Sequence, residues 1–152
     1  MIPDRVREVL ESNDLQAIEF EEGSTPTAVL AAEKLGVAVG NIAKSLLFVA
    51  KDGRYFMVVC AGDRKVANAK LKATIGVKTR MAGPEETFTA TGFHPGGVCP
   101  FGVGGIEILL DLSLQNYDTI YPAAGTDSSG VPMSFEELGR ITGGRLCDCT
   151  AE

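Results

Sequence analysis

Lys44 is the residue whose place in the sequence points most directly to chemistry. It lies in an apolar run, residues 42–50, that has the composition of a β-strand. Because side chains alternate along a strand, Lys44 shares an apolar face with Leu46 and Phe48, where lysine is rare without a partner. Its ammonium group either reaches solvent or an interior carboxylate, or projects into a pocket and polarises a carbonyl or phosphate oxygen of a ligand.

The stretch Gly92–Gly105 is the second feature that could carry chemistry. It holds six glycines and two prolines and can be neither a helix nor a paired strand for long. One interpretation is a tight structural loop with positive φ angles. The other is a loop whose backbone N–H groups line a concavity that holds an oxygen or a carboxylate. It lacks the spacing of a P-loop or of a dinucleotide fingerprint.

The single histidine and the four cysteines limit which metal sites and nucleophile pairs the chain could form. His94 and Cys99 lie five residues apart in the glycine-rich loop, a spacing that does not indicate a nucleophile pair. One histidine excludes a multi-histidine metal centre, and a Cys-x-Cys pair is closer than zinc ligands usually are. We therefore expect reduced thiols and no metal, with a thiol or zinc protein kept as an alternative; its residues would be Cys60, Cys99, Cys147 and Cys149.

The charges divide the chain into two unlike parts. Residues 38–80 hold nine basic and two acidic residues, a balance of +7, whereas the remainder holds five basic and 18 acidic residues, a balance of −13. The net charge of −6 therefore hides a basic stretch that contains no acid between Arg64 and Arg80. That stretch is either a solvated surface or a surface that binds an anion such as a nucleic-acid backbone.

Length and composition place the chain among ordinary globular proteins. With 152 residues, 45% hydrophobic and 22% charged, it predicts one domain over 1–152 and excludes disorder, collagen and coiled coil. No apolar run approaches the roughly 18 residues of a membrane span, and the charged N-terminus lacks a signal-peptide core. We expect a cytoplasmic protein with no membrane partner; the oligomeric state is left open.

The periodicity predicts interleaved helices and strands, some of the strands joined as hairpins. We therefore expect an α/β fold of α+β-like character: a mixed, curved, partly barrel-like sheet with helices around it. The predicted helices are 3–12, 28–36, 65–73, a short one beginning at Pro84, and 135–141 capped by Ser134; the predicted strands are 17–21, 42–50, 54–61, 77–81, 106–110 and 119–124, with a turn over 125–130.

The order of these motifs resembles a known family. A capped helix STPTAVLAAEKLGV, a strand lysine in NIAKSLLF, the loop GGVCPFG and the later YPAAG are together similar to the YbaK family, which is related to the editing domain of bacterial prolyl-tRNA synthetases. The resemblance covers about residues 3–148. It implies a free-standing aminoacyl-tRNA deacylase that acts on the 3′ end of a mischarged tRNA, without a cofactor, and makes prolyl-tRNA synthetase a candidate partner.

The resemblance also implies roles for individual residues. Lys44 would be the catalytic residue, and the family's Gly-x-x-x-Pro loop corresponds to Gly96–Pro100. The tRNA would contact Arg64, Lys65, Lys70 and Lys72. The residues expected to bind the substrate are Phe20, Ser45, His94, Gly96, Gly97, Val98, Cys99, Pro100, Phe101, Gly102, Ala124 and Gly125.

The amino acid to be removed stays open at this point. Ser45, Phe20 and the Ala123–Gly125 turn differ from residues common in the family, which leaves the amino-acid specificity open. We expect a small amino acid, such as alanine or cysteine, on a tRNA for proline. A second function of another class fits the same pocket: a non-catalytic regulator that binds a nucleotide or an aminoacyl-tRNA.

Overall fold

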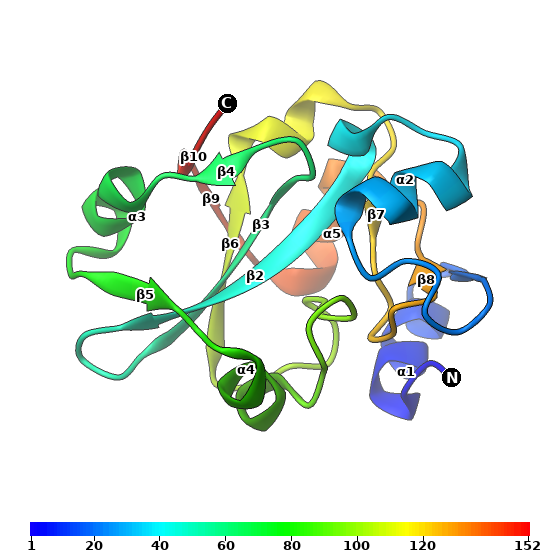
Figure 1. Cartoon of the computed structure of the whole chain (residues 1–152), viewed down its shortest axis with the longest axis horizontal. Coiled ribbons are helices and arrows are strands. Elements are labelled where there is room, and N and C mark those ends of the chain that lie inside the picture. The colour runs from blue at the N-terminus through cyan, green and yellow to red at the C-terminus, as the bar shows by residue number, and fades with distance from the viewer.

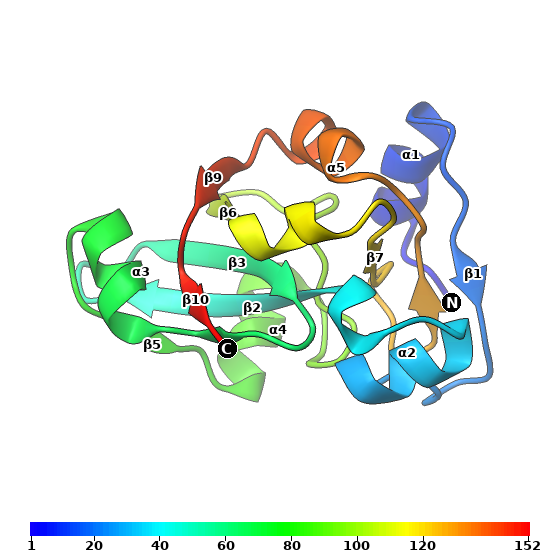
Figure 2. The same ribbon diagram turned by 90° about the horizontal axis from the view of Figure 1, so that it is seen from above.

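A central mixed sheet organises the protein, whose computed structural model describes all residues 1–152 (Figure 1). Its strands follow the order β5-β2-β3-β6-β9, with β7 paired to the same edge of β2 as β5. Two small antiparallel ladders, β1 with β8 and β4 with β10, lie outside it. Figures 1 and 2 both place helix α3 at one end of the molecule and α1 and α2 at the other.

The helices are short, and none is long and apolar enough to cross a bilayer. They are α1 (Asp4–Ser12), α2 (Ala28–Leu35), α3 (Asn68–Ile75), α4 (Pro84–Thr91) and α5 (Phe135–Thr142), with 3-10 turns η1 (Val39–Asn41) and η2 (Leu112–Asn116). The strands are β1 (Ile18–Glu19), β2 (Ile42–Ala50), β3 (Tyr55–Ala61), β4 (Lys65–Val66), β5 (Thr79–Met81), β6 (Ile106–Asp111), β7 (Tyr121–Pro122), β8 (Ser129–Gly130), β9 (Arg145–Cys147) and β10 (Thr150–Ala151).

The hairpin of β2 and β3 is the foundation of the sheet. Antiparallel pairs join the two strands from Ala43–Ala61 to Val49–Tyr55, and Gly53, at φ 92°, allows the reversal between them. Strands β6 and β9 then add in parallel to β3. The sheet is mixed, as predicted, but the partly barrel-like form is a correction: the two edges do not pair, so the sheet stays open.

Each face of the sheet buries its own apolar cluster. The larger cluster joins Met57 and Val59 of β3 to Leu10 of α1, Leu138 of α5 and Phe101 of the glycine-rich loop. The smaller cluster lies on the opposite face, where alternation places Phe56, Val58 and Cys60 beneath Leu71 of α3. The glycine-rich loop is thus fixed to the sheet by core packing, which positions everything that follows.

Three local predictions needed correction because long-range pairing overrides local pattern. The helix predicted over 65–73 begins only at Asn68, since Lys65 and Val66 pair as β4 with β10 at the C-terminus. The turn predicted over 125–130 contains β8, which pairs with β1. The strand predicted over 119–124 shrinks to Tyr121–Pro122, because Pro122 has no N–H to extend a ladder.

Candidate active site

Two neighbouring hollows share the glycine-rich loop. The larger, about 440 Å³, lies between this loop, the segment around Phe20 and the turn that contains Gly125. The smaller, about 80 Å³, lies between α2, the start of β2 and the loop. Gly97 lines the larger hollow, whereas Gly96 and Val98 line the smaller, so the loop forms the wall between them.

Close backbone contacts explain the two consecutive glycines of this wall. A Cβ at Gly97 would lie 2.9 Å from both Cα and N of Thr126, a distance that real Cβ atoms do not show. Gly96 has φ 94° and packs against the main chain of Pro26. The loop can therefore approach both neighbouring segments only because these two positions lack side chains.

Arg5 of α1 connects the glycine-rich loop to the first helix, a role that the sequence did not predict. Its guanidinium group donates to the carbonyl oxygens of Thr91 and Gly102 and lies 4.1 Å from the ring centroid of Phe93. Ninety-seven positions separate Arg5 from Gly102. An arginine in an amphipathic helix gives no local signal of such a contact.

Lys44 lies on the wall of the smaller hollow, with its side chain half-buried. Its Nζ donates to the carbonyl oxygens of Gly62, at 3.4 Å, and Arg64. The ammonium group is therefore held by main-chain carbonyls and not by a carboxylate. Since it has three N–H donors and these two acceptors, one donor remains for a ligand.

Next to Lys44, a short part of one edge of β2 has no strand partner. On that edge β7 pairs with Ile42 and Ala43, and β5 pairs only from Phe48 onward. The Leu47 carbonyl accepts from Ala82 N at this edge, and backbone polar groups alternate along a strand. The N–H and C=O of Ser45 therefore face the same edge, where Ser45 lines the smaller hollow.

A network of hydroxyl groups fixes the turn that follows β7. Ser129 Oγ accepts hydrogen bonds from Ala124 N at 3.0 Å and from Thr126 Oγ1 at 2.8 Å. Ser129 N in turn donates to Thr25 Oγ1, just before α2. This turn supplies walls to both hollows, through Thr126 to the larger and Ser129 to the smaller. Neither residue was predicted, because Thr-Asp-Ser-Ser indicates only a loop.

The structure brings most of the predicted substrate-binding residues to one region. The smaller hollow is lined by Lys44, Ser45, Gly96 and Val98, and the larger by Phe20, His94, Gly97 and Gly125. Cys99, Pro100, Phe101 and Ala124 line neither hollow and are buried. Gly102 lies against Arg5, and the predicted tRNA-binding residues Arg64, Lys65, Lys70 and Lys72 lie outside both hollows.

Comparison with known proteins supplies the family. The model of the aminoacyl-tRNA editing domain matches residues 22–141, a span that contains both Lys44 and the glycine-rich loop. The chain belongs to the aminoacyl-tRNA editing domain family. Its similarity to YwhH of Bacillus subtilis strain 168, a protein without an assigned function, is 41% identity over 125 residues, which covers 82% of this chain and 79% of YwhH.

The chain is also similar to part of a larger enzyme and to a protein of known structure. A proline–tRNA ligase of Limosilactobacillus fermentum is 34% identical over 74% of this chain, but the match spans only 21% of that ligase. A crystal structure of a protein proposed to be a trans-editing enzyme for prolyl-tRNA synthetase has a TM-score of 0.89 and 33% identity, covering 98% of this chain and 96% of that one. The mixed α/β architecture is therefore that of the editing domain.

The thiols of this editing domain are buried. Burial raises the pKa of Cys60 and of Cys99 to about 12, so both are protonated at neutral pH. The ligand atoms of Asp111, Cys147 and Cys149 lie within 4.8 Å of one another and are the one such group that could hold a metal ion. However, the Asp111 carboxylate already accepts from Ser113 N, Cys149 N and Thr150 Oγ1, which gives it a structural role.

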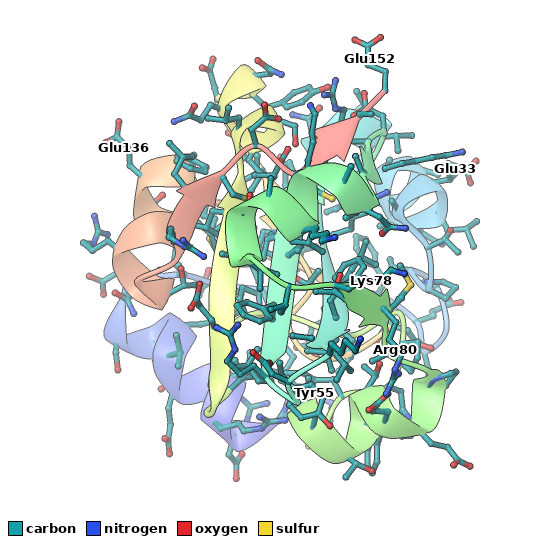
Figure 3. All side chains as sticks on the ribbon, turned by 90° about the vertical axis from the view of Figure 1, so that its left-hand side faces the viewer. Glu33, Tyr55, Lys78, Arg80, Glu136 and Glu152 are labelled. Carbon is teal, nitrogen blue, oxygen red and sulfur yellow. The ribbon has the colours of Figure 1, made fainter.

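The basic residues gather at the α3 end of the domain, but acids near the C-terminus engage some of them. Lys70 pairs with Asp148 at 3.1 Å, and Arg64 Nη1 lies 3.6 Å from Glu152. Lys65 and Lys72 are exposed and make no ion pair. Figure 3 faces this end and labels Lys78 and Arg80, which lie across the view from Glu136. Lys78 extends the basic surface, whereas Arg80 is paired with Glu86 at 2.7 Å.

Proposed function

We propose that this chain is an aminoacyl-tRNA deacylase that acts in trans in the cytoplasm. It hydrolyses the ester between a small, wrongly attached amino acid, such as alanine or cysteine, and the 3′-terminal adenosine of a tRNA for proline. The observation that carries the proposal is that a half-buried Lys44 lines the same hollow as Gly96 and Val98 of the glycine-rich loop, in a member of the editing-domain family. Similarity to proline–tRNA ligases and to a protein proposed to edit for prolyl-tRNA synthetase supports this choice of tRNA.

The two hollows suit the two ends of such a substrate. The larger, at about 440 Å³, accepts the terminal adenosine and offers the rings of Phe20 and His94 for stacking. His94 is itself stacked on Phe88, with ring centroids 4.3 Å apart. The smaller hollow, at about 80 Å³, accepts the side chain of a small amino acid and excludes larger ones. The ester then lies across the Gly96–Gly97 wall.

The reaction needs a positioned ester and stabilisation of the charge that develops on its carbonyl oxygen. Lys44 supplies its remaining N–H donor to that oxygen, in a site where reduced solvation strengthens the interaction. A water molecule attacks the carbonyl carbon, the ester C–O bond breaks, and the 3′ oxygen leaves with a proton. The products are the free amino acid and the uncharged tRNA.

Water is the preferred nucleophile because the nearest thiol is unsuitable. Cys99 is fully buried in the core, and burial raises its pKa to about 12, so it is a protonated thiol at neutral pH. Since the loop's main chain faces the hollows while Cys99 and Phe101 pack inward, the loop acts through its backbone.

A panel of tRNA substrates tests the proposal. The tRNA for proline is charged with alanine, cysteine, serine or proline, each labelled, and release of the amino acid is followed with and without the protein. We expect release of a small wrong amino acid and no acceleration for proline. If no ester in the panel is cleaved faster than in buffer, the proposal is wrong, and slower cleavage would favour a non-catalytic binder.

A further inference from the structure

We infer that the smaller hollow recognises a hydroxyl group on the amino acid to be removed, and that Ser45 determines this specificity. The inference rests on the proposed function and narrows its substrate class from small amino acids to serine. It starts from one atom: Ser45 Oγ is the only buried side-chain oxygen or nitrogen in the chain that has no hydrogen-bond partner. Buried polar groups in proteins are normally paired, so this exception points to a partner supplied from outside.

The threonine and other serine hydroxyl groups of the smaller hollow already have partners, and the phenol of Tyr121, which has none, belongs to a side chain that is only partly buried. Thr27 Oγ1 accepts from Leu30 N as the N-cap of α2, and Thr25 Oγ1 accepts from Ser129 N. Ser129 Oγ is bonded within its own turn. Ser45 therefore carries the one buried hydroxyl group of this lining whose donor and acceptor capacity is unused.

The backbone at Ser45 adds two more unused polar groups on the same side. Its N–H and C=O face the edge of β2 that has no strand partner between β7 and β5. An aminoacyl group that enters there meets a hydroxyl, an N–H and a C=O from one residue, and the neighbouring Lys44 also lines this hollow. Such an arrangement can orient both the polar side chain and the ester carbonyl of the bound aminoacyl group.

Size and polarity together select serine. A hollow of about 80 Å³ admits the side chains of alanine, cysteine and serine, so volume does not separate them. Only the serine hydroxyl can either donate a full-strength hydrogen bond to Ser45 Oγ or accept one from it, since a thiol is a weak partner and a methyl group is none. Alanine would leave the buried Ser45 hydroxyl unpaired in the complex.

The test compares kcat/KM for seryl- and alanyl-tRNA, both on the tRNA for proline, between the wild type and Ser45 variants. We expect the wild type to prefer the seryl ester about tenfold, the size of one neutral hydrogen bond. Ser45→Ala should bring the ratio close to one by slowing the seryl ester alone, and Ser45→Thr should restore it. Ser12→Ala, on the exposed side of α1, is the matched control and should leave the ratio unchanged.

Two further measurements keep folding and chemistry separate from recognition. Because Ser45 Oγ bonds to nothing, Ser45→Ala should unfold at a temperature no lower than the wild type. Non-hydrolysable 3′-seryl and 3′-alanyl amides of 3′-amino-3′-deoxyadenosine, compared by calorimetry, should show the same tenfold preference. Equal binding of the two amides, or an equal loss on both esters in Ser45→Ala, overturns the inference. Preferential binding of the seryl amide without hydrolysis of any ester overturns only the deacylase proposal.

Discussion

The carbonyl oxygen of Arg64 accepts a hydrogen bond from Nζ of Lys44, twenty positions earlier in the chain. The side chain of Arg64 turns the other way, and its Nε lies 3.2 Å from Thr150 Oγ1. Thr150 Oγ1 in turn donates to the buried carboxylate of Asp111 at 2.8 Å. A chain of polar contacts therefore joins the proposed catalytic lysine to the C-terminal strand.

Removing the Thr150 hydroxyl should weaken catalysis without weakening substrate binding. Thr150→Val keeps the shape of the side chain but loses both contacts, so the Arg64 carbonyl is less well fixed under Lys44. We expect kcat to fall roughly 10- to 100-fold with KM nearly constant, because small displacements of reacting groups cost that much. Steady-state kinetics measures both constants, and Thr150→Ser, which keeps the hydroxyl, should behave like the wild type. A rise in KM alone would contradict this role.

Asp111 should make the protein sensitive to acid. Burial by itself would raise its pKa, but hydrogen bonds from Ser113, Cys149 and Thr150 lower the pKa below the ordinary value of 3.8. A lowered pKa in the folded state means that the stabilisation is complete above the unfolded value and is lost as pH falls through the folded one. Urea unfolding from pH 6 to pH 2 should show stability declining below about pH 4.

The variant Asp111→Asn tests whether that decline belongs to Asp111. The amide would turn an N–H₂ group toward at least one of the three donors, so we expect the free energy of unfolding to drop by about 2 kcal/mol at pH 7. Its remaining acid-dependent decline should be shallower than that of the wild type. An identical slope below pH 4 in both proteins would assign the decline to other carboxylates.

The basic surface around α3 should contribute salt-dependent tRNA affinity. Reversing Lys70 and Lys72 to glutamate should weaken binding more at 50 mM than at 300 mM salt, because phosphate contacts release counterions. Lys72 should have the larger effect, since Lys70 is already paired with Asp148. Filter binding across a salt series measures the slope, with Arg140→Glu on α5 as the matched charge reversal. If the charge reversals changed tRNA affinity equally at all salt concentrations, the lysines of α3 would not contact phosphates and would only be solvated.

Gly97 should not tolerate a side chain. Gly97→Ala would place a Cβ 2.9 Å from the main chain of Thr126, so the wall between the hollows must shift. We expect deacylation to fall at least tenfold, with a loss of stability of about 1–3 kcal/mol from overpacking. Gly104→Ala, in the same loop, is the matched control, because a Cβ at Gly104 would meet no atom within 4 Å. An active Gly97→Ala protein would show that the wall is not part of the site.

Local sequence signals predicted the elements that depend on local physics. The Asp52–Gly53 turn, the strand 42–50 and the helix capped by Ser134 appear as predicted, the last with a complete capping box. The loop over 92–105 also contains no regular element. The elements missed, β4 and β8 to β10, exist only through partners far along the chain, and strands of two or three residues carry no periodicity to detect.

The candidate site was predictable in its residue types but not in its geometry. Strand alternation singled out Lys44, and the glycine content singled out the loop, yet neither pattern indicates that the Gly62 and Arg64 carbonyls hold the ammonium group. The division into two hollows depends on the contact of Gly97 with Thr126, which only tertiary structure reveals. The unpaired Ser45 hydroxyl is likewise a property of the surrounding structure and not of the sequence.

Single-turnover hydrolysis by the wild type and by Lys44→Ala tests whether Lys44 is the catalytic residue. The substrates are seryl- and alanyl-tRNA for proline, and circular dichroism of both proteins checks that the fold is kept. Loss of the Lys44 donor should slow hydrolysis about 10²- to 10³-fold, as removal of an oxyanion donor does in other enzymes, while the melting temperature stays close to that of the wild type. Hydrolysis by a folded Lys44→Ala protein at the wild-type rate would show that Lys44 is not catalytic.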